Sequence, residues 1–344
     1  MKRFLIIFSL AAAFFVLKLF YQAGQFKSVE NEFNGEVIKI YTNVYGPEDM
    51  QIDHETGNLF ISSTNRRVEG NDPKNGIYLL NVNDSVDPKK LPSDYPDEFN
   101  PHGISLLKKD GNIYLFAVNH NNKGHFIEVF KFQDDRLEHL KSYSHDRMCC
   151  PNDVVATDLD KFYVTNDHGS GEGIMRIVED YLRIPRASIF YYDGNDFIKE
   201  AAPFHYANGI NISKDGKRLF LTTTTGNALD IFNVEEDGTI IEDHIIDLGS
   251  GVDNIDIDEE GNLWIAAHPK LLDYVDHSKD ANEHSPSEVF KLTPDGDDFK
   301  VELVYSNDGS EISGSSVAIF HQGELFVGVV LEPTILRARL ASDD

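Results

Sequence analysis

The stretch from Val252 to His268, VDNIDIDEEGNLWIAAH, decides the fold. It opens on a carboxylate and an amide, Asp253 and Asn254, and then alternates apolar and polar residues as a β-strand does. A Glu-Gly turn at Gly261 supplies the positive φ that a tight hairpin requires, and a second strand returns and ends on His268. The stretch therefore predicts a β-hairpin whose first strand begins with polar side chains.

The same pattern occurs six times along the chain. The copies begin at Glu48, His102, Asn152, Asn208, Asp253 and Gly314, so that neighbouring copies start 45 to 61 residues apart. A period near ~50 residues with strand signals throughout is typical of propeller blades and not of helical repeats. Single alternating strands between the copies complete each blade. The sequence predicts an all-β fold, a six-bladed β-propeller over residues 37–344.

The N-terminus has the pattern of a targeting segment over residues 1–20. Lys2 and Arg3 precede an apolar run from Phe4 to Phe20. A run of roughly 17 residues is short for a membrane span and long for the apolar part of a cleaved signal. We expect an uncleaved signal-anchor, and a signal peptide cleaved near residues 11–13 stays open. Residues 21–36 then form a polar linker, and the protein is expected in the secretory pathway, membrane-anchored or extracellular.

Composition limits the partners. The chain of 344 residues has 58 acidic and 31 Lys and Arg residues, a formal charge of −27, which argues against nucleic acid as a partner. We expect membrane contact only through the N-terminal segment.

Cys149 and Cys150 are the only cysteines and are adjacent, so they cannot join distant parts of the fold. Asn83, in the polar sequon Asn-Asp-Ser, is a candidate glycosylation site.

One segment interrupts the strand pattern. Residues 173–183, GIMRIVEDYLR, place apolar side chains at helical spacing with charges on the other side. The spacing predicts a short helical insertion in blade three. We expect its apolar stripe to pack on the blades beneath it, and a pocket wall or a membrane contact is the alternative.

The polar residues that begin the repeats are candidate metal ligands. The first strand of a blade is the one nearest the propeller axis, so residues far apart in the sequence converge there. Most of the repeats begin with side-chain oxygens, at Glu48-Asp49, Asn152-Asp153, Asn208 and Asp253-Asn254. Mixed carboxylate and amide oxygens are the ligands that Ca²⁺ prefers, whereas Zn²⁺ would call for Cys or clustered His. The alternative is that these residues only cap turns, but so many carboxylates grouped without a cation would repel one another.

Eight short motifs carry a family resemblance. They are GPED at 46–49, PHGIS at 101–105, VNH at 118–120, PNDVVA at 151–156, TNDH at 165–168, ANGINIS at 207–213, VDNI at 252–255 and AHP at 267–269. With these motifs the chain resembles the serum paraoxonase/arylesterase family, which consists of calcium-dependent six-bladed propellers that hydrolyse lactones and aryl esters. It departs from the animal members in having no cysteine pair to join its ends. Closure of the ring is therefore expected to rest on strand pairing between residues 37–41 and the last blade.

The resemblance implies two calcium ions and a histidine dyad. The ligands that it implies for a catalytic ion are Glu48, Asn152, Asn208, Asp253 and Asn254. Those that it implies for a structural ion are Asp49, Asp153 and the backbone carbonyl of Ile104. His102 and His120 match the dyad, and His168 and His268 match positions near the pocket.

The chemistry expected from this resemblance is hydrolysis of a small-molecule ester or lactone, with organophosphate esters as a side activity. Ca²⁺ would polarise the carbonyl while His102, assisted by His120, activates water. The sequence contains no G-x-S-x-G nucleophile motif. Two alternatives remain: a propeller like gluconolactonase or strictosidine synthase, and a non-catalytic binding propeller stabilised by calcium.

Overall fold

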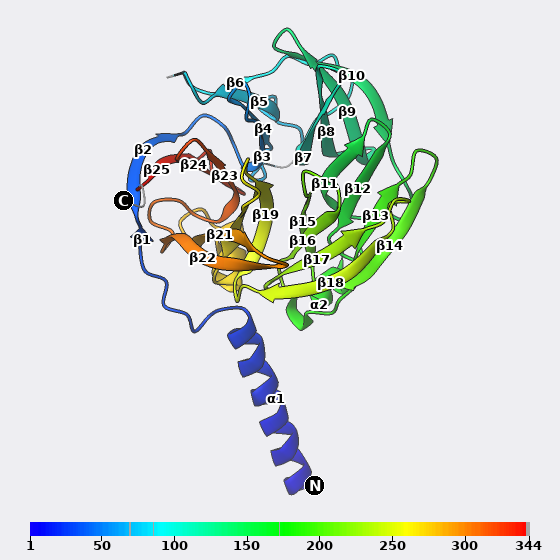
Figure 1. The fold of residues 1–344 in the computed structure, drawn as a ribbon. Helices are drawn as coiled ribbons and strands as arrows, with labels where there is room; N and C mark the ends of the chain where they lie inside the picture. Colours follow the sequence, from blue (N-terminus) through cyan, green and yellow to red (C-terminus); the bar gives the residue numbers. More distant parts are fainter. Residues whose placement is uncertain (69, 85, 172, 342–344) are drawn as a thin grey trace.

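The computed structural model describes residues 1–68, 70–84, 86–171 and 173–341. It is a six-bladed β-propeller, as the repeats predict, in which six antiparallel sheets are arranged around a central axis (Figure 1). Helix α1 (Lys2–Gln22) projects away from the ring.

Blades one to five are each built from four consecutive strands, and blade six from three consecutive strands and one from the N-terminal part of the chain. In every blade the first of the consecutive strands is innermost. Blades one to three comprise β3 (Pro47–Asp53), β4 (Asn58–Ser63), β5 (Gly76–Asn81), β6 (Lys89–Lys90), β7 (Pro101–Lys109), β8 (Asn112–Asn121), β9 (Gly124–Gln133), β10 (Arg136–Tyr143), β11 (Pro151–Asp158), β12 (Lys161–Asn166), β13 (Ala187–Tyr192) and β14 (Phe197–Phe204). Blades four to six comprise β15 (Ala207–Ile212), β16 (Arg218–Thr223), β17 (Ala228–Val234), β18 (Ile240–Asp247), β19 (Gly251–Ile257), β20 (Leu263–His268), β21 (Ser287–Asp295), β22 (Asp298–Asn307), β23 (Ser315–His321), β24 (Glu324–Val329) and β25 (Ile335–Leu340).

The N-terminal part of the chain closes the ring. Strand β2 (Gly35–Tyr41) is the outer strand of blade six and pairs antiparallel with β25, with Tyr41 opposite Ile335. This confirms the expected closure by strand pairing. Strand β1 (Glu32–Phe33), inside the segment expected as a linker, adds an outer strand to blade five by pairing with β22.

The apolar core lies between adjacent blades. Alternating strand residues point to the neighbouring sheet, so each interface between two blades has its own layer of buried side chains. Between blades five and six, for example, the rings of Trp264 and Phe320 stack with centroids 4.5 Å apart. These layers hold the innermost strands in fixed positions around the axis.

Two helices lie near the end of the ring where the innermost strands begin. Helix α2 (Ile174–Leu182) is the predicted insertion in blade three, between β12 and β13. The expectation that its apolar stripe packs on the blades is wrong, because Ile174 and Ile177 are 79% and 55% exposed. Its buried residue is Glu179, which accepts a hydrogen bond from the Gly169 amide.

Helix α3 (Leu271–Lys279) follows β20 in blade five and was not predicted. On the outer surface of blade one, Asn83 is exposed, as a glycosylation site requires. Ser85, the third residue of its sequon, lies outside the described residues.

Candidate metal and active site

Every innermost strand has a β-bulge at its start. The register between the first and second strands shifts there in all six blades. The residues skipped by the shifts are Glu48, His102-Gly103, Asn152-Asp153, Asn208-Gly209, Asp253-Asn254 and Ser316. A bulge leaves residues out of the ladder and redirects their side chains. Six equivalent bulges therefore place the first residues of the repeats together at one end of the ring.

Direct hydrogen bonds join the clustered residues of blades one, five and six. The Asn254 amide Nδ2 donates to Glu48 Oε1 over 3.0 Å. The Ser316 hydroxyl lies 3.1 Å from both Glu48 Oε1 and Asp253 Oδ2. Sequence reasoning missed Ser316, although it occupies the sixth repeat's equivalent of the Glu48 position. Aligning the bulges instead of the first polar residues would have found it.

One oxygen of each predicted catalytic-ion ligand is buried without a hydrogen-bond partner among the described residues. These atoms are Glu48 Oε2, Asn152 Oδ1, Asn208 Oδ1, Asp253 Oδ1 and Asn254 Oδ1, all on residues no more than 4% exposed. A buried polar atom left unpartnered costs about 1–3 kcal/mol. Two carboxylate and three amide oxygens are a donor set suited to Ca²⁺, so the residues present fit this ion.

The residues predicted for the structural ion have a different arrangement. Asp49 Oδ2 accepts the Ile104 N–H of blade two over 2.6 Å, and Asp153 Oδ2 accepts the Ile210 N–H of blade four over 2.8 Å. Each carboxylate therefore ties its own blade to the next one. Gly103 leaves room for the Asp153 carboxylate, because a Cβ at position 103 would lie 2.2 Å from Asp153 Oδ1.

The buried carboxylates repel one another. Burial raises the pKa of Asp49 well above its usual range, and the charges of Asp153 and Glu48 raise it further. Burial likewise raises the pKa of Asp253, against the hydrogen bond from His268. Burial also raises the pKa of Glu48, but His102 and Arg66 outweigh it and bring that pKa to about 2. A divalent cation among these groups would offset the repulsion.

Arg66 is a second residue that sequence reasoning missed. Its Nη1 atom donates to the carbonyl oxygens of Gly46 and Val330, over 3.3 and 3.4 Å. Its Nη2 atom lies 3.8 Å from the unpartnered Glu48 Oε2. Arg66 comes from the loop between β4 and β5, and nothing in its local sequence marks it as part of the site.

The predicted histidine dyad is the start of a row of three. His102 Nδ1 lies 2.9 Å from His120 Nε2, and His120 Nδ1 lies 2.7 Å from His125 Nδ1. At the other end, His102 Nε2 is 3.4 Å from Glu48 Oε1. Burial, together with the charges of His102 and His125, lowers the pKa of His120 well below its usual range. Sequence reasoning missed His125, which faces His120 directly across the β8–β9 hairpin.

A cavity of about 460 Å³ lies over the cluster. Asn208, Asp253 and His268 are among its lining residues. The remaining walls come from the three helices and adjoining loops: Leu19, Phe20 and Ala23 at the end of α1, Arg176, Asp180 and Tyr181 of α2, Leu271, Leu272, Tyr274 and Val275 of α3, and Arg183, Tyr206, Thr224 and Thr225. The cavity thus has a polar floor and largely apolar sides.

The two histidines expected near the pocket have different surroundings. His268 lines the cavity, with Nε2 3.0 Å from Asp253 Oδ2 and its ring stacked on Tyr274. His168 is not among the lining residues and binds Asp167 and Asp180, each over 2.7 Å. Burial lowers the pKa of His168, but these two carboxylates outweigh it and raise that pKa to about 9. His168 therefore holds helix α2 in place by an ion pair.

The fold is similar to that of solved structures that include a gluconolactonase and a calcium-binding protein. A gluconolactonase from Xanthomonas campestris aligns with a TM-score of 0.57 and 15% identity, covering 92% of this chain and 99% of that one. Regucalcin from Agrobacterium tumefaciens, a calcium-binding protein, aligns with a TM-score of 0.54 and 15% identity, covering 92% and 98%. At these identities the likeness shows the fold alone.

Sequence comparison is more specific. Human serum paraoxonase/arylesterase 1 is 32% identical over 308 residues, covering 84% of this chain and 85% of that protein. Rat serum paraoxonase/arylesterase 2 is 35% identical over 242 residues, covering 68% and 67%. Rabbit serum paraoxonase/lactonase 3 is 30% identical over 309 residues, covering 84% and 85%. The arylesterase family model matches residues 71–337. The chain therefore belongs to the arylesterase family.

Proposed function

We propose that this protein is a calcium-dependent hydrolase of lactones and aryl esters, with organophosphate esters as a side activity. The observation that carries the proposal is the set of five buried, unpartnered oxygens close to the floor of an open cavity. The relatives in the arylesterase family are named as arylesterases and a lactonase, which supports the reaction class.

Two calcium ions are proposed per chain. Glu48, Asn152, Asn208, Asp253 and Asn254 would hold the catalytic ion through their unpartnered oxygens. Asp49, Asp153 and the carbonyl of Ile104 would hold the structural ion, since both carboxylates keep lone pairs beyond those used by backbone N–H groups. The bound catalytic ion supplies a Lewis acid that polarises the substrate carbonyl.

The histidine row supplies a base and a path for the proton. Two tautomer sets satisfy both contacts, and the one that makes His102 a base has His102 donating from Nδ1 to His120 Nε2 and His120 donating from Nδ1 to His125 Nδ1. In this set His102 Nε2 keeps its lone pair on the side of Glu48 and can take a proton from water. The Glu48 carboxylate, 3.4 Å away, then stabilises the imidazolium that forms.

The cavity favours uncharged substrates with an apolar part. Its volume of about 460 Å³ is within the usual range for small-molecule sites. Leu271, Leu272 and Val275 of α3 give one wall an aliphatic surface, and Phe20 adds an aromatic ring from α1. An alkyl lactone or a phenyl ester would bury this apolar part against the walls, with its carbonyl toward Asp253.

The reaction is tested with a panel of alkyl lactones and phenyl esters in the presence of Ca²⁺. Wild-type protein is expected to hydrolyse both classes, and His102→Gln to reduce kcat by about 100-fold with unchanged calcium content, because the general base is lost. His244→Gln, on the outer strand β18, is the matched control. Lactone hydrolysis unaltered in His102→Gln would favour a gluconolactonase-like mechanism, and no hydrolysis by the wild type would favour a binding propeller.

We also propose that α1 is an uncleaved membrane anchor. Its segment Arg3–Gln22 is long and apolar enough to cross a membrane and is not buried against the propeller. Its C-terminal end is fixed to the ring, where Asn227 donates to the Gln22 carbonyl and the Leu271 N–H to the Ala23 carbonyl, both over 2.9 Å. Cleavage near residues 11–13 would leave Leu19 and Phe20 in the cavity wall, whereas removal of the whole segment up to Phe20 would take both away.

Expression in a secretory host tests the anchor. The full-length protein is expected to stay in the membrane pellet after carbonate extraction, because an apolar helix of this length partitions into the bilayer. A chain that starts at Tyr21 behind a cleavable signal is expected in the supernatant, with a KM raised several-fold for apolar substrates since the α1 wall is gone. Release of full-length protein by carbonate would contradict the anchor.

A further inference from the structure

Three innermost strands carry polar residues at both ends. At their starts, β3, β19 and β23 contribute Glu48, Asp253 and Ser316 to the candidate calcium site. At or just beyond their other ends stand His54, Glu259 and His321. The two members of each pair are five or six positions apart along extended chain, a distance of about 17–20 Å. A second polar cluster therefore lies at the end of the ring opposite the cavity.

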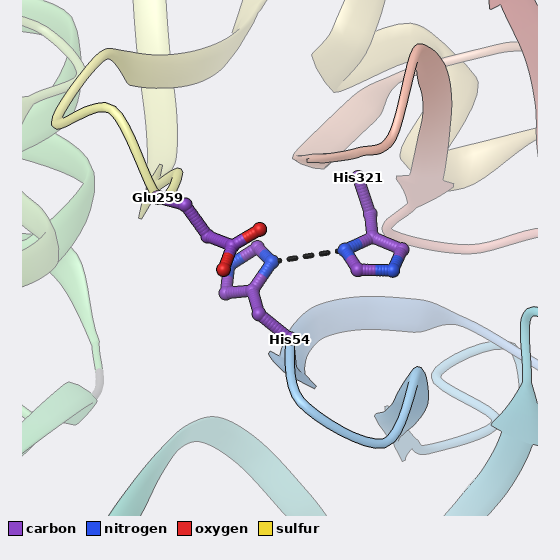
Figure 2. Close-up of side chains that lie close together, drawn as sticks. All are labelled: His54, Glu259 and His321. Carbon is purple, nitrogen blue, oxygen red and sulfur yellow. Dashed lines mark hydrogen bonds between the residues drawn. The ribbon is translucent and has the colours of Figure 1, made fainter.

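Figure 2 shows how this second cluster is arranged. His54 Nδ1 lies 3.0 Å from His321 Nδ1. One ligand-type atom of each residue, including a carboxylate oxygen of Glu259, lies within 4.8 Å of the other two. The His321 side chain is buried, that of His54 is half-buried and that of Glu259 is exposed, so solvent reaches the cluster at Glu259.

The two imidazoles face each other through the same ring nitrogen, Nδ1, and so present two ligand atoms to one position. Two Nδ1 atoms at 3.0 Å can share only one hydrogen, so one ring donates and the other accepts. A divalent cation accepts both lone pairs. Imidazole binds a metal ion in its neutral form, through the ring nitrogen that carries no hydrogen.

The negative surroundings also favour a cation. Burial lowers the pKa of His54, and the carboxylates of Glu259, Asp258 and Asp53 all oppose this lowering. Asp53 accepts hydrogen bonds from Glu55 N and Thr56 Oγ1 and pairs with Lys108, while Asp258 accepts from Asn262 and from the Trp264 indole. Glu259 has the exposed side chain and is the carboxylate able to turn toward an ion.

We propose that His54, Glu259 and His321 form a second metal site, for a late first-row divalent cation such as Zn²⁺. Two imidazole nitrogens and one carboxylate are a common donor set for Zn²⁺, with water in the remaining position, whereas Ca²⁺ prefers oxygen ligands alone. The site is independent of the proposed hydrolase function.

The position of the site gives it a structural role. His54 belongs to blade one, Glu259 to blade five and His321 to blade six. Blades one and six are neighbours only because the ring closes, and the adjacent Cys149 and Cys150 cannot join them by a disulfide. An ion held by these three residues links the first blade to the last two and stabilises the closed ring.

Zinc titration of the untagged full-length protein, in saturating Ca²⁺ and against a chromophoric chelator, tests the site. The wild type is expected to bind one Zn²⁺ per chain with a micromolar or lower Kd. His54→Gln and His321→Gln are each expected to weaken binding at least about 100-fold, and Glu259→Gln about 10-fold. Co²⁺ should give the visible absorption of a four-coordinate site in the wild type only. His244→Gln, a partly exposed histidine on β18, is the control and should bind Zn²⁺ like the wild type.

Zinc is also expected to raise the melting temperature of the wild type and not that of Glu259→Gln. The proposal is overturned if the wild type binds no Zn²⁺ at 0.1 mM (about −5.5 kcal/mol in binding free energy), or if His54→Gln and Glu259→Gln bind as tightly as the wild type. Both of these side chains are partly or fully exposed, so the test stands even if His321→Gln does not fold. Because the readout is metal binding, its failure is separate from any failure of ester hydrolysis.

Discussion

Asp253→Asn is expected to reduce kcat/KM for lactone hydrolysis by about 100- to 1,000-fold without unfolding the protein. The side chains have the same shape, so His268 and Ser316 keep a polar partner at the second oxygen position. The unpartnered Oδ1, however, loses its negative charge or becomes an amide nitrogen. A neutral ligand holds Ca²⁺ less tightly, and the substrate carbonyl beside it is less polarised.

The matched control is Asp256→Asn, three residues farther along β19. Asp256 is also a buried carboxylate, and burial raises its pKa to about 7, but it does not belong to the bulge. It is expected to keep wild-type calcium content and wild-type kcat/KM. Equal losses in the two variants would mean that the Asp253 effect is general destabilisation and not loss of a ligand.

Asp153→Asn is expected to lower the free energy of unfolding by about 3 kcal/mol at saturating Ca²⁺. The two Asp153 oxygens accept N–H groups from Val154 and from Ile210 of the next blade. An asparagine can accept only one of them, and its amide also removes a charged oxygen from the proposed structural ion. The melting temperature measured by calorimetry should fall by about 5–10 °C.

Asp230→Asn controls for the loss of a buried carboxylate. Asp230 lies on β17, accepts a hydrogen bond from the Thr223 hydroxyl over 3.0 Å, and has a pKa raised to about 6 by burial. Its replacement should lower the free energy of unfolding by less than about 1 kcal/mol, because the asparagine carbonyl can accept the same hydrogen bond. An Asp153→Asn protein as stable as Asp230→Asn would argue against a structural ion at Asp153.

The fold was predictable because it repeats. Six copies of one hairpin pattern each gave the same strand assignment, so the assignment did not depend on any single copy. The pairing of strand 37–41 with the last blade followed from the need to close a ring without a disulfide. The first residues of each repeat converge for the same geometric reason. Their unpartnered oxygens could not be predicted, since they depend on the bulges and on which side-chain atoms find partners.

The residues that sequence reasoning missed depend on contacts between blades or across turns. Ser316 bonds to Glu48 and Asp253 from other blades, and Arg66 reaches the site from an irregular loop.

The apolar stripe of α2 was expected on the blades because amphipathic helices in soluble proteins usually bury that side. Here the buried position is Glu179, and the His168–Asp180 pair holds the helix from its polar side.

Removal and return of calcium tests the central claim most directly. The purified protein is dialysed against a calcium chelator under conditions where circular dichroism shows it still folded, and lactone hydrolysis is measured before dialysis, after it, and after Ca²⁺ or Mg²⁺ is added. The account predicts that the rate falls below about 1% of its starting value and is restored by Ca²⁺ and not by Mg²⁺. A folded, calcium-free protein that hydrolyses the lactone at its original rate would contradict it.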